Sequence, residues 1–251
     1  MVQQALPTDT YTEPDITTCT EPDNTTYPEP DISNLVTEDD TPVDNWASEK
    51  HQRFLVSCLY SSRQSRNFLA AANVGIFHTI KQPPVVPDVF LSLDVTVPDN
   101  WWEKKNRSYL IWEFGKPPEV VIEIVSNKQG EELGNKLRIY SRMRVSYYVV
   151  FDPSLQLGDK VLRVYEIRGM RYVEKTDNWL EEVELGLTLW AGEFEGRQDM
   201  WLRWCDRDGN ILLTGDEHTL QAQQRAEQAQ QRAQLLAEQL RNLGIDPDTL
   251  S

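Results

Sequence analysis

The sequence predicts an α/β fold, in which apolar strands alternate with amphipathic helices. Residues 120–125 (VVIEIV) form an apolar run of strand length, and residues 145–153 (VSYYVVFDP) form a second one. The segment between them, residues 131–144, is predicted to be a helix. Its inward stripe at helical spacing consists of Leu133, Leu137, Tyr140 and Arg144. A helix between two buried strands is typical of this fold class.

An earlier helix is expected to begin near Trp46, with Ser48 as its N-cap. Its apolar stripe consists of Phe54, Leu55, Cys58 and Leu59. Glu49 and His51 lie in its first turn, where a solvated position is favoured over a role in a neighbouring site.

Further strands are predicted on both sides of this central pattern. Two or three of them, broken by Gly75 and Pro83-Pro84, fall between residues 68 and 95. Residues 161–167 and 171–175 form a predicted hairpin with its turn at Gly169.

The chain is predicted to have three parts. Residues 1–45 form an acidic tail, and residues 46–214 form the folded domain, with a core at about 48–175 and covering strands and turns at 176–214. Residues 215–251 contain a helix rich in Gln, Ala and Glu. Such a polar helix is unstable alone, so a coiled coil with a second copy is expected, and a frayed, solvated helix is the alternative.

The tail is expected to be disordered. TEPDITTC, TEPDNTTY and PEPDISNL follow one another at a period of eight, and units this short and polar cannot bury enough surface to fold. A Ca²⁺-binding role for the Glu-Pro-Asp units is disfavoured because they lack the Gly that such loops use.

Most of the acidity lies in that tail. The 251 residues have a formal charge of −15, and eleven of their 40 acids lie in residues 1–45, which contain no Lys or Arg. Residues 46–251 are left with 29 acids against 25 bases. Contact with nucleic acid would therefore need a local basic patch, since the overall charge repels phosphates.

The cysteines and the N-terminus indicate a reducing compartment. Cys19, Cys58 and Cys205 have spacings that fit neither a disulfide framework nor a zinc site. The sequence shows no leader pattern and no apolar run long enough to cross a bilayer. A cytoplasmic protein without a membrane partner is expected.

The strongest chemical signal is Glu123, a carboxylate inside the apolar run of residues 120–125. Burying an ionised carboxylate costs several kcal/mol, roughly, unless it is paired or bound to a cation. Alternation along a strand places Glu123 on one face with Val121 and Val125. Asp88 opens a neighbouring predicted strand, and Lys136 lies on the predicted helix, at the edge of its inward stripe. Asp88 taken alone fits a turn or capping residue, and its alternative role is to meet Glu123 when the strands pair.

These three side chains suit phosphodiester hydrolysis. A divalent cation neutralises the transition state and supplies hydroxide near neutral pH. Two acids and one main-chain carbonyl suffice for Mg²⁺, which keeps several waters. A lysine can orient or deprotonate the attacking water, or stabilise the developing charge.

Three stretches in order, VVPDVFLSLDV, PPEVVIEIVSN and LGNKLRIYSRMRVSYYVVFDP, resemble the Uma-two family of endonucleases, in the PD-(D/E)XK restriction-endonuclease-like superfamily. The resemblance covers roughly residues 48–172 and implies a central mixed sheet flanked by helices. It also implies a metal-dependent endonuclease acting on nucleic acid, with DNA the expected substrate. Asp88, Glu123 and the backbone carbonyl of Ile124 would bind Mg²⁺ or Mn²⁺.

One position departs from the superfamily pattern. Its lysine stands two residues after the second acid, where this chain has Val125. Lys136 resembles the displaced lysine of the family and is assigned the catalytic role, with Lys128 as the competing candidate.

Two other interpretations stay open. A catalytically weak or inactive nuclease-fold protein could act as an oligomerising interaction module, which the acidity and the displaced lysine favour. A glycosidase-type carboxylate pair is disfavoured by the nearby lysine.

An aromatic and basic segment, residues 99–118, looks like an insertion. It contains Trp101, Trp102, Tyr109 and Trp112 among Lys104, Lys105 and Arg107. Packing is the favoured role of these aromatics, and stacking on nucleobases is the alternative.

Overall fold

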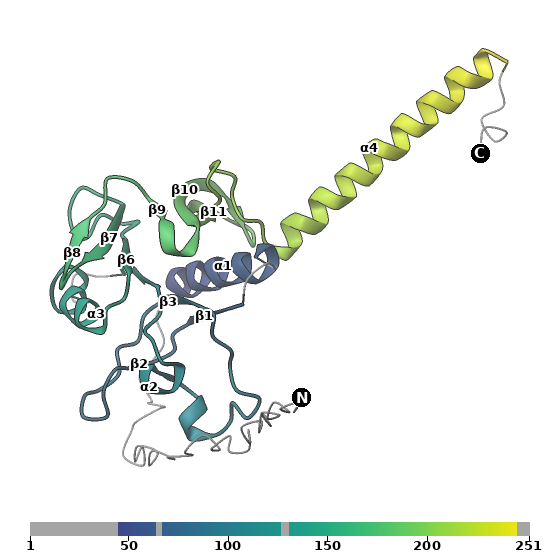
Figure 1. Ribbon diagram of the computed structural model, residues 1–251. Coiled ribbons are helices and arrows are strands. Elements are labelled where there is room, and N and C mark those ends of the chain that lie inside the picture. Colours follow the sequence, from purple (N-terminus) through teal and green to yellow (C-terminus); the bar gives the residue numbers. More distant parts are fainter. Residues whose placement is uncertain (1–44, 64–66, 127–130, 245–251) are drawn as a thin grey trace, which may run out of the picture. The chain divides into compact units, whose positions relative to one another are not determined.

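The computed structural model describes residues 45–63, 67–126 and 131–244 (Figure 1). Residues 1–44 of the predicted tail, which include Cys19, and Lys128 lie outside the described residues. The helices are α1 (Trp46–Ser62), η1 (Lys104–Asn106), α2 (Ile111–Phe114), η2 (Glu132–Lys136), α3 (Leu137–Met143), η3 (Glu181–Val183) and α4 (Gly215–Asn242). The strands are β1 (Phe68–Ala72), β2 (Ile76–Phe77), β3 (Val89–Leu93), β4 (Tyr109–Leu110), β5 (Val120–Ile124), β6 (Tyr147–Phe151), β7 (Leu162–Arg168), β8 (Arg171–Glu174), β9 (Trp179–Leu180), β10 (Leu185–Phe194) and β11 (Arg197–Cys205).

The central sheet is mixed, as the family resemblance implied. Its six strands run in the order β1-β3-β5-β6-β7-β8. Only β5 and β6 pair in parallel, and every other neighbouring pair in this sheet is antiparallel. A parallel pair needs a crossover connection, which here contains η2 and α3. The predicted hairpin of β7 and β8 turns at Gly169, which has a φ of +65°.

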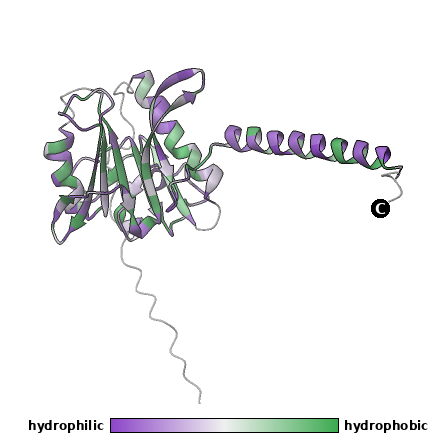
Figure 2. Cartoon of the chain, turned by 90° about the horizontal axis from the view of Figure 1, so that it is seen from above, coloured by the Kyte–Doolittle hydropathy of each residue, from purple (hydrophilic) through white to green (hydrophobic). Residues whose placement is uncertain are grey.

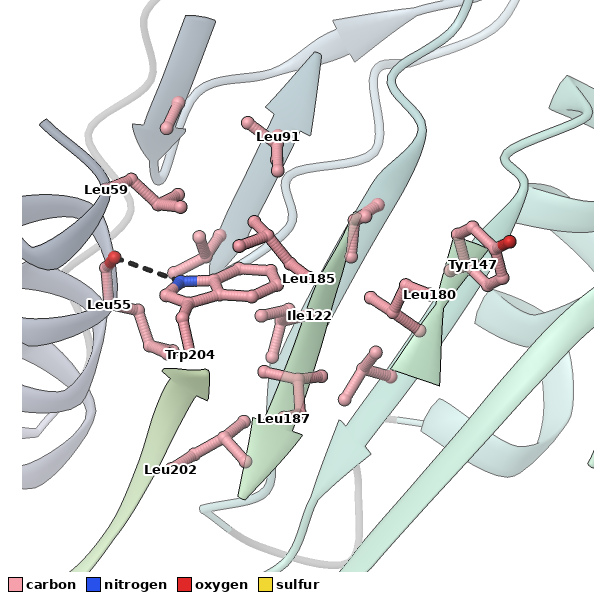
Figure 3. Close-up of a cluster of buried hydrophobic side chains, with 14 of the residues drawn as sticks. Leu55, Leu59, Leu91, Ile122, Tyr147, Leu180, Leu185, Leu187, Leu202 and Trp204 are labelled. Carbon is pink, nitrogen blue, oxygen red and sulfur yellow. Dashed lines mark hydrogen bonds between the residues drawn. The ribbon is translucent and has the colours of Figure 1, made fainter. Parts of the chain in front are cut away.

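The two faces of the sheet belong to two separate apolar clusters. Val120, Ile122 and Ile124 of β5 join the first cluster, which also contains residues of α1 and of the β9–β11 sheet. Figure 3 shows this cluster around Trp204, whose indole Nε1 donates to the carbonyl of Leu55 at 3.1 Å. Val121 and Val125 join the second cluster, with Tyr140 and Met143 of α3. Helices therefore flank both faces, and the predicted alternation of β5 is confirmed.

The first helix has a different cap from the predicted one. Asn45 is the N-cap, since its Oδ1 accepts from the backbone N–H groups of Ala47 and Ser48, both at 3.0 Å. Ser48 is buried inside the helix, so its prediction as N-cap was wrong. A side chain that faces the core cannot turn back to the free N–H groups of the first turn.

The helix before β6 also differs from its predicted form. Its first part, η2, is π-helical, and the N–H of Lys136 donates to the carbonyl of Glu131 at 3.2 Å, five residues back. The wider turn shifts the helical phase by one residue. Leu133 is consequently 39% exposed, while Glu132 is 5% exposed. The predicted inward stripe was wrong at Leu133 and at Arg144, which is also exposed.

The C-terminal helix is present as predicted. It begins with a capping box, in which the N–H of Glu217 donates to Thr214 Oγ1 and the N–H of Thr214 donates to Glu217 Oε2. None of its described side chains is buried, and Figure 2 shows mainly hydrophilic residues along it. Among the helices of the described ranges, none combines the length and the hydropathy of a membrane span. Cys58 and Cys205 are buried free thiols.

Candidate functional site

Strand pairing brings Asp88 to the end of β5. Strands β3 and β5 are antiparallel with Val89 opposite Ile122, so Asp88 comes next to Glu123 in the register. Asp88 is 7% exposed, and its Oδ2 accepts from the backbone N–H of Ile124 at 2.6 Å. The side chain of Asp88 thus adds a hydrogen bond between the two strands just beyond their last paired residues, and it lies beside the strand that carries Glu123.

Two polar side chains that sequence reasoning missed hold Asp88 from the other side. Gln52 of α1 donates its Nε2 to Asp88 Oδ1 at 2.7 Å. The amides of Gln52 and Asn73 bond to each other, with 2.8 Å from Asn73 Nδ2 to Gln52 Oε1. Gln52 is only 3% exposed. Gln52 stands three residues before Leu55 and seven before Leu59, so its place on the apolar stripe of the helix was the available signal.

Glu123 is 1% exposed, and each of its oxygens has a strong donor. Lys136 Nζ lies 2.7 Å from Glu123 Oε2, and the hydroxyl of Tyr140 donates to Oε1 at 2.7 Å. The structure therefore brings together all three side chains predicted for the site: Asp88, Glu123 and Lys136.

The protonation equilibria reflect this burial. Desolvation raises the pKa of Glu123 to about 7, against the opposing charge of Lys136 and with a further increase from the nearby Asp88. Desolvation lowers the pKa of Lys136, but the charge and hydrogen bond of Glu123 outweigh it, so the net shift is upward. The upward shift of Lys136 depends on an ionised Glu123. Lys136 stays cationic in either case, since it is 28% exposed at the side chain and Glu132 also attracts it.

Glu132 is a further acid of the cluster. Its Oε1 lies 3.5 Å from Lys136 Nζ, and its Oε2 is buried and has no hydrogen-bond partner. The carbonyl of Glu132 accepts from the hydroxyl of Tyr148 at 2.9 Å. The π-helical turn thus positions Lys136 between the two glutamates, which explains how a lysine far from the usual position reaches the strand acid.

Glu49 and His51 do not contribute to this cluster. Glu49 is exposed and pairs with Arg53, as expected for a solvated first turn. His51 is 3% exposed, so the prediction of a solvated position was wrong for it. Its ring lies between Phe151 and Trp201, with centroids at 5.1 and 4.5 Å, and burial lowers its pKa to about 4.

The aromatic residues of the insertion divide into two groups. Tyr109 is buried against Phe90 and Phe114, and Trp112 packs beside Phe77, as the packing interpretation predicts. Trp101 and Trp102 are 58% and 78% exposed, so packing was the wrong prediction for these two.

Comparison with known proteins identifies the family. The family model named Uma2, described as "Putative restriction endonuclease", matches residues 34–189. A solved structure titled as a putative nuclease belonging to DUF820 from Anabaena variabilis is similar at 14% identity, covering 55% of this chain and 73% of that chain, with a TM-score of 0.38. No curated protein matched the chain. Because the Uma2 model spans more than half of the sequence, the chain belongs to this family of restriction-endonuclease-type proteins.

Proposed function

We propose that this protein is a metal-dependent endonuclease that hydrolyses phosphodiester bonds of nucleic acid, with DNA the expected substrate. The observation that supports this most directly is the contact of 2.7 Å between Lys136 Nζ and Glu123 Oε2, next to Asp88. An inert domain would be more stable with an apolar residue in place of Glu123. Retaining a fully buried acid beside a second acid favours a chemical role.

The donors at the site fit Mg²⁺ or Mn²⁺. Asp88, Glu123 and the backbone carbonyl of Ile124 would hold the ion. In a strand the N–H and C=O of one residue point to the same side, so the carbonyl of Ile124 faces Asp88, as its N–H does. Each carboxylate oxygen that accepts one hydrogen bond keeps a further lone pair. Within the described residues no group of three or more His, Cys, Asp or Glu is placed to hold an ion, so the proposed site depends on two carboxylates, one main-chain carbonyl and water.

A bound cation would supply charge neutralisation and a water of lowered pKa. Lys136 carries a positive charge in the site and would steady the negative charge that develops on the phosphate. Its raised pKa argues against the role of general base, so we assign it electrostatic stabilisation and orientation of water. Tyr140 keeps its proton, because burial and Glu123 raise its pKa, and its hydroxyl fixes the orientation of Glu123.

Cleavage of supercoiled plasmid and of single-stranded DNA, with Mg²⁺, Mn²⁺ or EDTA, tests this proposal. Native protein should cut only with metal, and Glu123→Gln and Lys136→Ala should each cut at least about 100-fold more slowly. Lys160→Ala is the matched control, since Lys160 is an exposed partner of Glu174. This variant should cut like the native protein. Equal cutting by all variants would contradict the assignment.

A second candidate function is an interaction module that keeps the fold without catalysis, and α4 supports it. Six of its residues and its C-cap follow the alternating spacing of four and three that a heptad requires: Ala222, Ala226, Ala229, Ala233, Leu236, Leu240 and the C-cap Leu243. The small residues would let two helices approach closely. We propose that α4 pairs with α4 of a second copy, and a protein that assembles but never cuts would favour this candidate.

A further inference from the structure

An apolar cavity of about 570 Å³ lies beside the edge strand β1, outside the Asp88 and Glu123 cluster. Leu69 of β1, Phe90 of β3 and Tyr109 of the insertion form part of its wall, and Trp101 and Trp102 also line it. We call it the tryptophan pocket. Its size and apolar wall suit a flat organic group.

The two tryptophans are placed to bind a ligand rather than to stabilise the fold. Trp101 and Trp102 are more than half exposed, although burial of such side chains is favourable. Their ring centroids are 6.3 Å apart and the ring planes meet at 75°, so the two indoles meet edge to face and do not stack face to face. Adjacent exposed indoles at the mouth of an apolar cavity are typical of an interaction site.

The charge around the tryptophan pocket favours an anionic ligand. None of the described residues that line it is acidic, in a chain with 40 Asp and Glu. The one charged lining residue is Arg107, which is exposed and donates its Nε to the carbonyl of Trp102 at 2.8 Å. Lys104 and Lys105 belong to η1 in the same segment. Residues 99–107 contain these two lysines and Arg107 against Asp99 and Glu103, so their formal charge is +1. Aromatic faces among basic side chains match a nucleobase and its phosphates.

The pocket also lies on the side of the sheet that carries Glu123. Leu69 and Phe90 belong to the same apolar cluster as Val121 and Val125, the neighbours of Glu123 on its face of β5. Phe90 comes two residues after Asp88, a rise of about 7 Å along an extended strand. Strand β3 and the Asp88 directly before it therefore contribute to both the acid site and the wall of the pocket.

We propose that the tryptophan pocket holds an unpaired nucleobase of the strand whose phosphate lies at the Asp88 and Glu123 site. This inference rests on the proposed nuclease function and narrows its substrate. A paired base cannot enter a pocket without leaving its helix, so the preferred substrate is single-stranded or locally unpaired nucleic acid.

Binding of fluorescein-labelled strands, followed by anisotropy in EDTA so that no cleavage occurs, tests the proposal. The full-length native protein should bind single-stranded DNA more tightly than a duplex or an abasic strand of the same length. The double variant Trp101→Ala, Trp102→Ala should bind the single strand about 10-fold more weakly and the abasic strand unchanged. Trp102→Phe should keep most of the affinity, because a phenyl face still stacks.

Trp46→Ala is the matched control, since Trp46 is 86% exposed and does not line the pocket. Native affinity of the double variant, or an equal loss on the abasic strand, would overturn the proposal. The proposal would also be overturned if the double variant kept its DNA affinity but differed from the native protein in mass by sedimentation, since the pocket would then be a contact between copies.

Parallel cleavage assays separate this proposal from the nuclease itself. If the native protein cuts with Mg²⁺ and the double variant binds single-stranded DNA as tightly as the native protein does, only the pocket assignment fails. If the pocket effect is seen and no cutting occurs, the nuclease proposal fails and the pocket remains a nucleic-acid-binding site.

Discussion

Replacing Glu217 with alanine should destabilise the folded domain strongly, because it would leave a buried guanidinium without its carboxylate. Arg203 of β11 is 1% exposed, and its Nη1 and Nη2 donate to Glu217 at 2.8 and 2.7 Å. The guanidinium also lies over the rings of Phe54 and Trp190, at 4.6 and 4.8 Å. Its Nη2 also donates to the carbonyl of Leu212 at 2.6 Å and its Nε has no hydrogen-bond partner, so within the described residues Glu217 is the carboxylate that balances its charge.

The magnitude follows from what the substitution leaves behind. Removing one partner of a buried ion pair costs about 3–5 kcal/mol, and the lower end applies because the side chain of Glu217 is 30% exposed. Losing the Glu217 half of the capping box adds roughly 0.5 kcal/mol. The total of about 3–4 kcal/mol corresponds to a fall of roughly 10 °C in Tm for a domain of this size.

Urea unfolding followed by circular dichroism would measure this loss, with Asp216→Ala as the control. Asp216 is the neighbouring acid of the same helical turn and is exposed, so its replacement should cost about 0.5 kcal/mol or less. Arg203→Met should cost less than Glu217→Ala, because it removes the buried charge together with the need for a partner. Equal losses for Glu217→Ala and Asp216→Ala would refute the reasoning.

Three further predictions concern the site, the core and α4. Saturating Mg²⁺ or Mn²⁺, at about 100 times the Kd, should raise the stability of the native protein by about 3 kcal/mol, and Asp88→Asn should abolish the gain in a thermal melt; an equal gain in both would exclude Asp88 as a ligand. Burial lowers the pKa of His51 to about 4 from an ordinary 6.5, so its contribution to stability is complete above pH 6.5 and is lost as the pH falls toward 4, by about 3 kcal/mol. In urea unfolding, His51→Phe should have about the same free energy of unfolding at pH 7 and at pH 4. A fall between these pH values as large as that of the native protein would contradict the reasoning. Deleting residues 221–251 keeps Glu217 and the 3.0 Å contact of His218 with Ser62, and it should lower the number of chains per particle seen by light scattering. An unchanged number of chains would exclude α4 as the contact between copies.

The fold and site were open to prediction where the signal is local. The alternation in residues 120–125 determined which side of β5 carries Glu123, because side chains of a strand alternate whatever surrounds it. The position of Asp88 at the start of a strand was likewise enough to bring it beside Glu123 once β3 and β5 pair. The Gly169 hairpin and the C-terminal helix depend on turn chemistry and helical composition, which are also local.

Tertiary structure decided the features that depend on the space between elements. The π-helical turn of Glu132–Lys136 exposes Leu133, buries Glu132 and delivers Lys136 to Glu123, and its hydrogen bonds to the fifth residue back leave no periodic pattern in so short a segment. Gln52 meets Asp88 from another element, and the exposure of Trp101 and Trp102 depends on what fails to pack against them. The sequence by itself therefore determined the family, the α/β class and the two strand acids. The hydrogen bonds that hold those acids, and the surface left open beside them, required the three-dimensional arrangement.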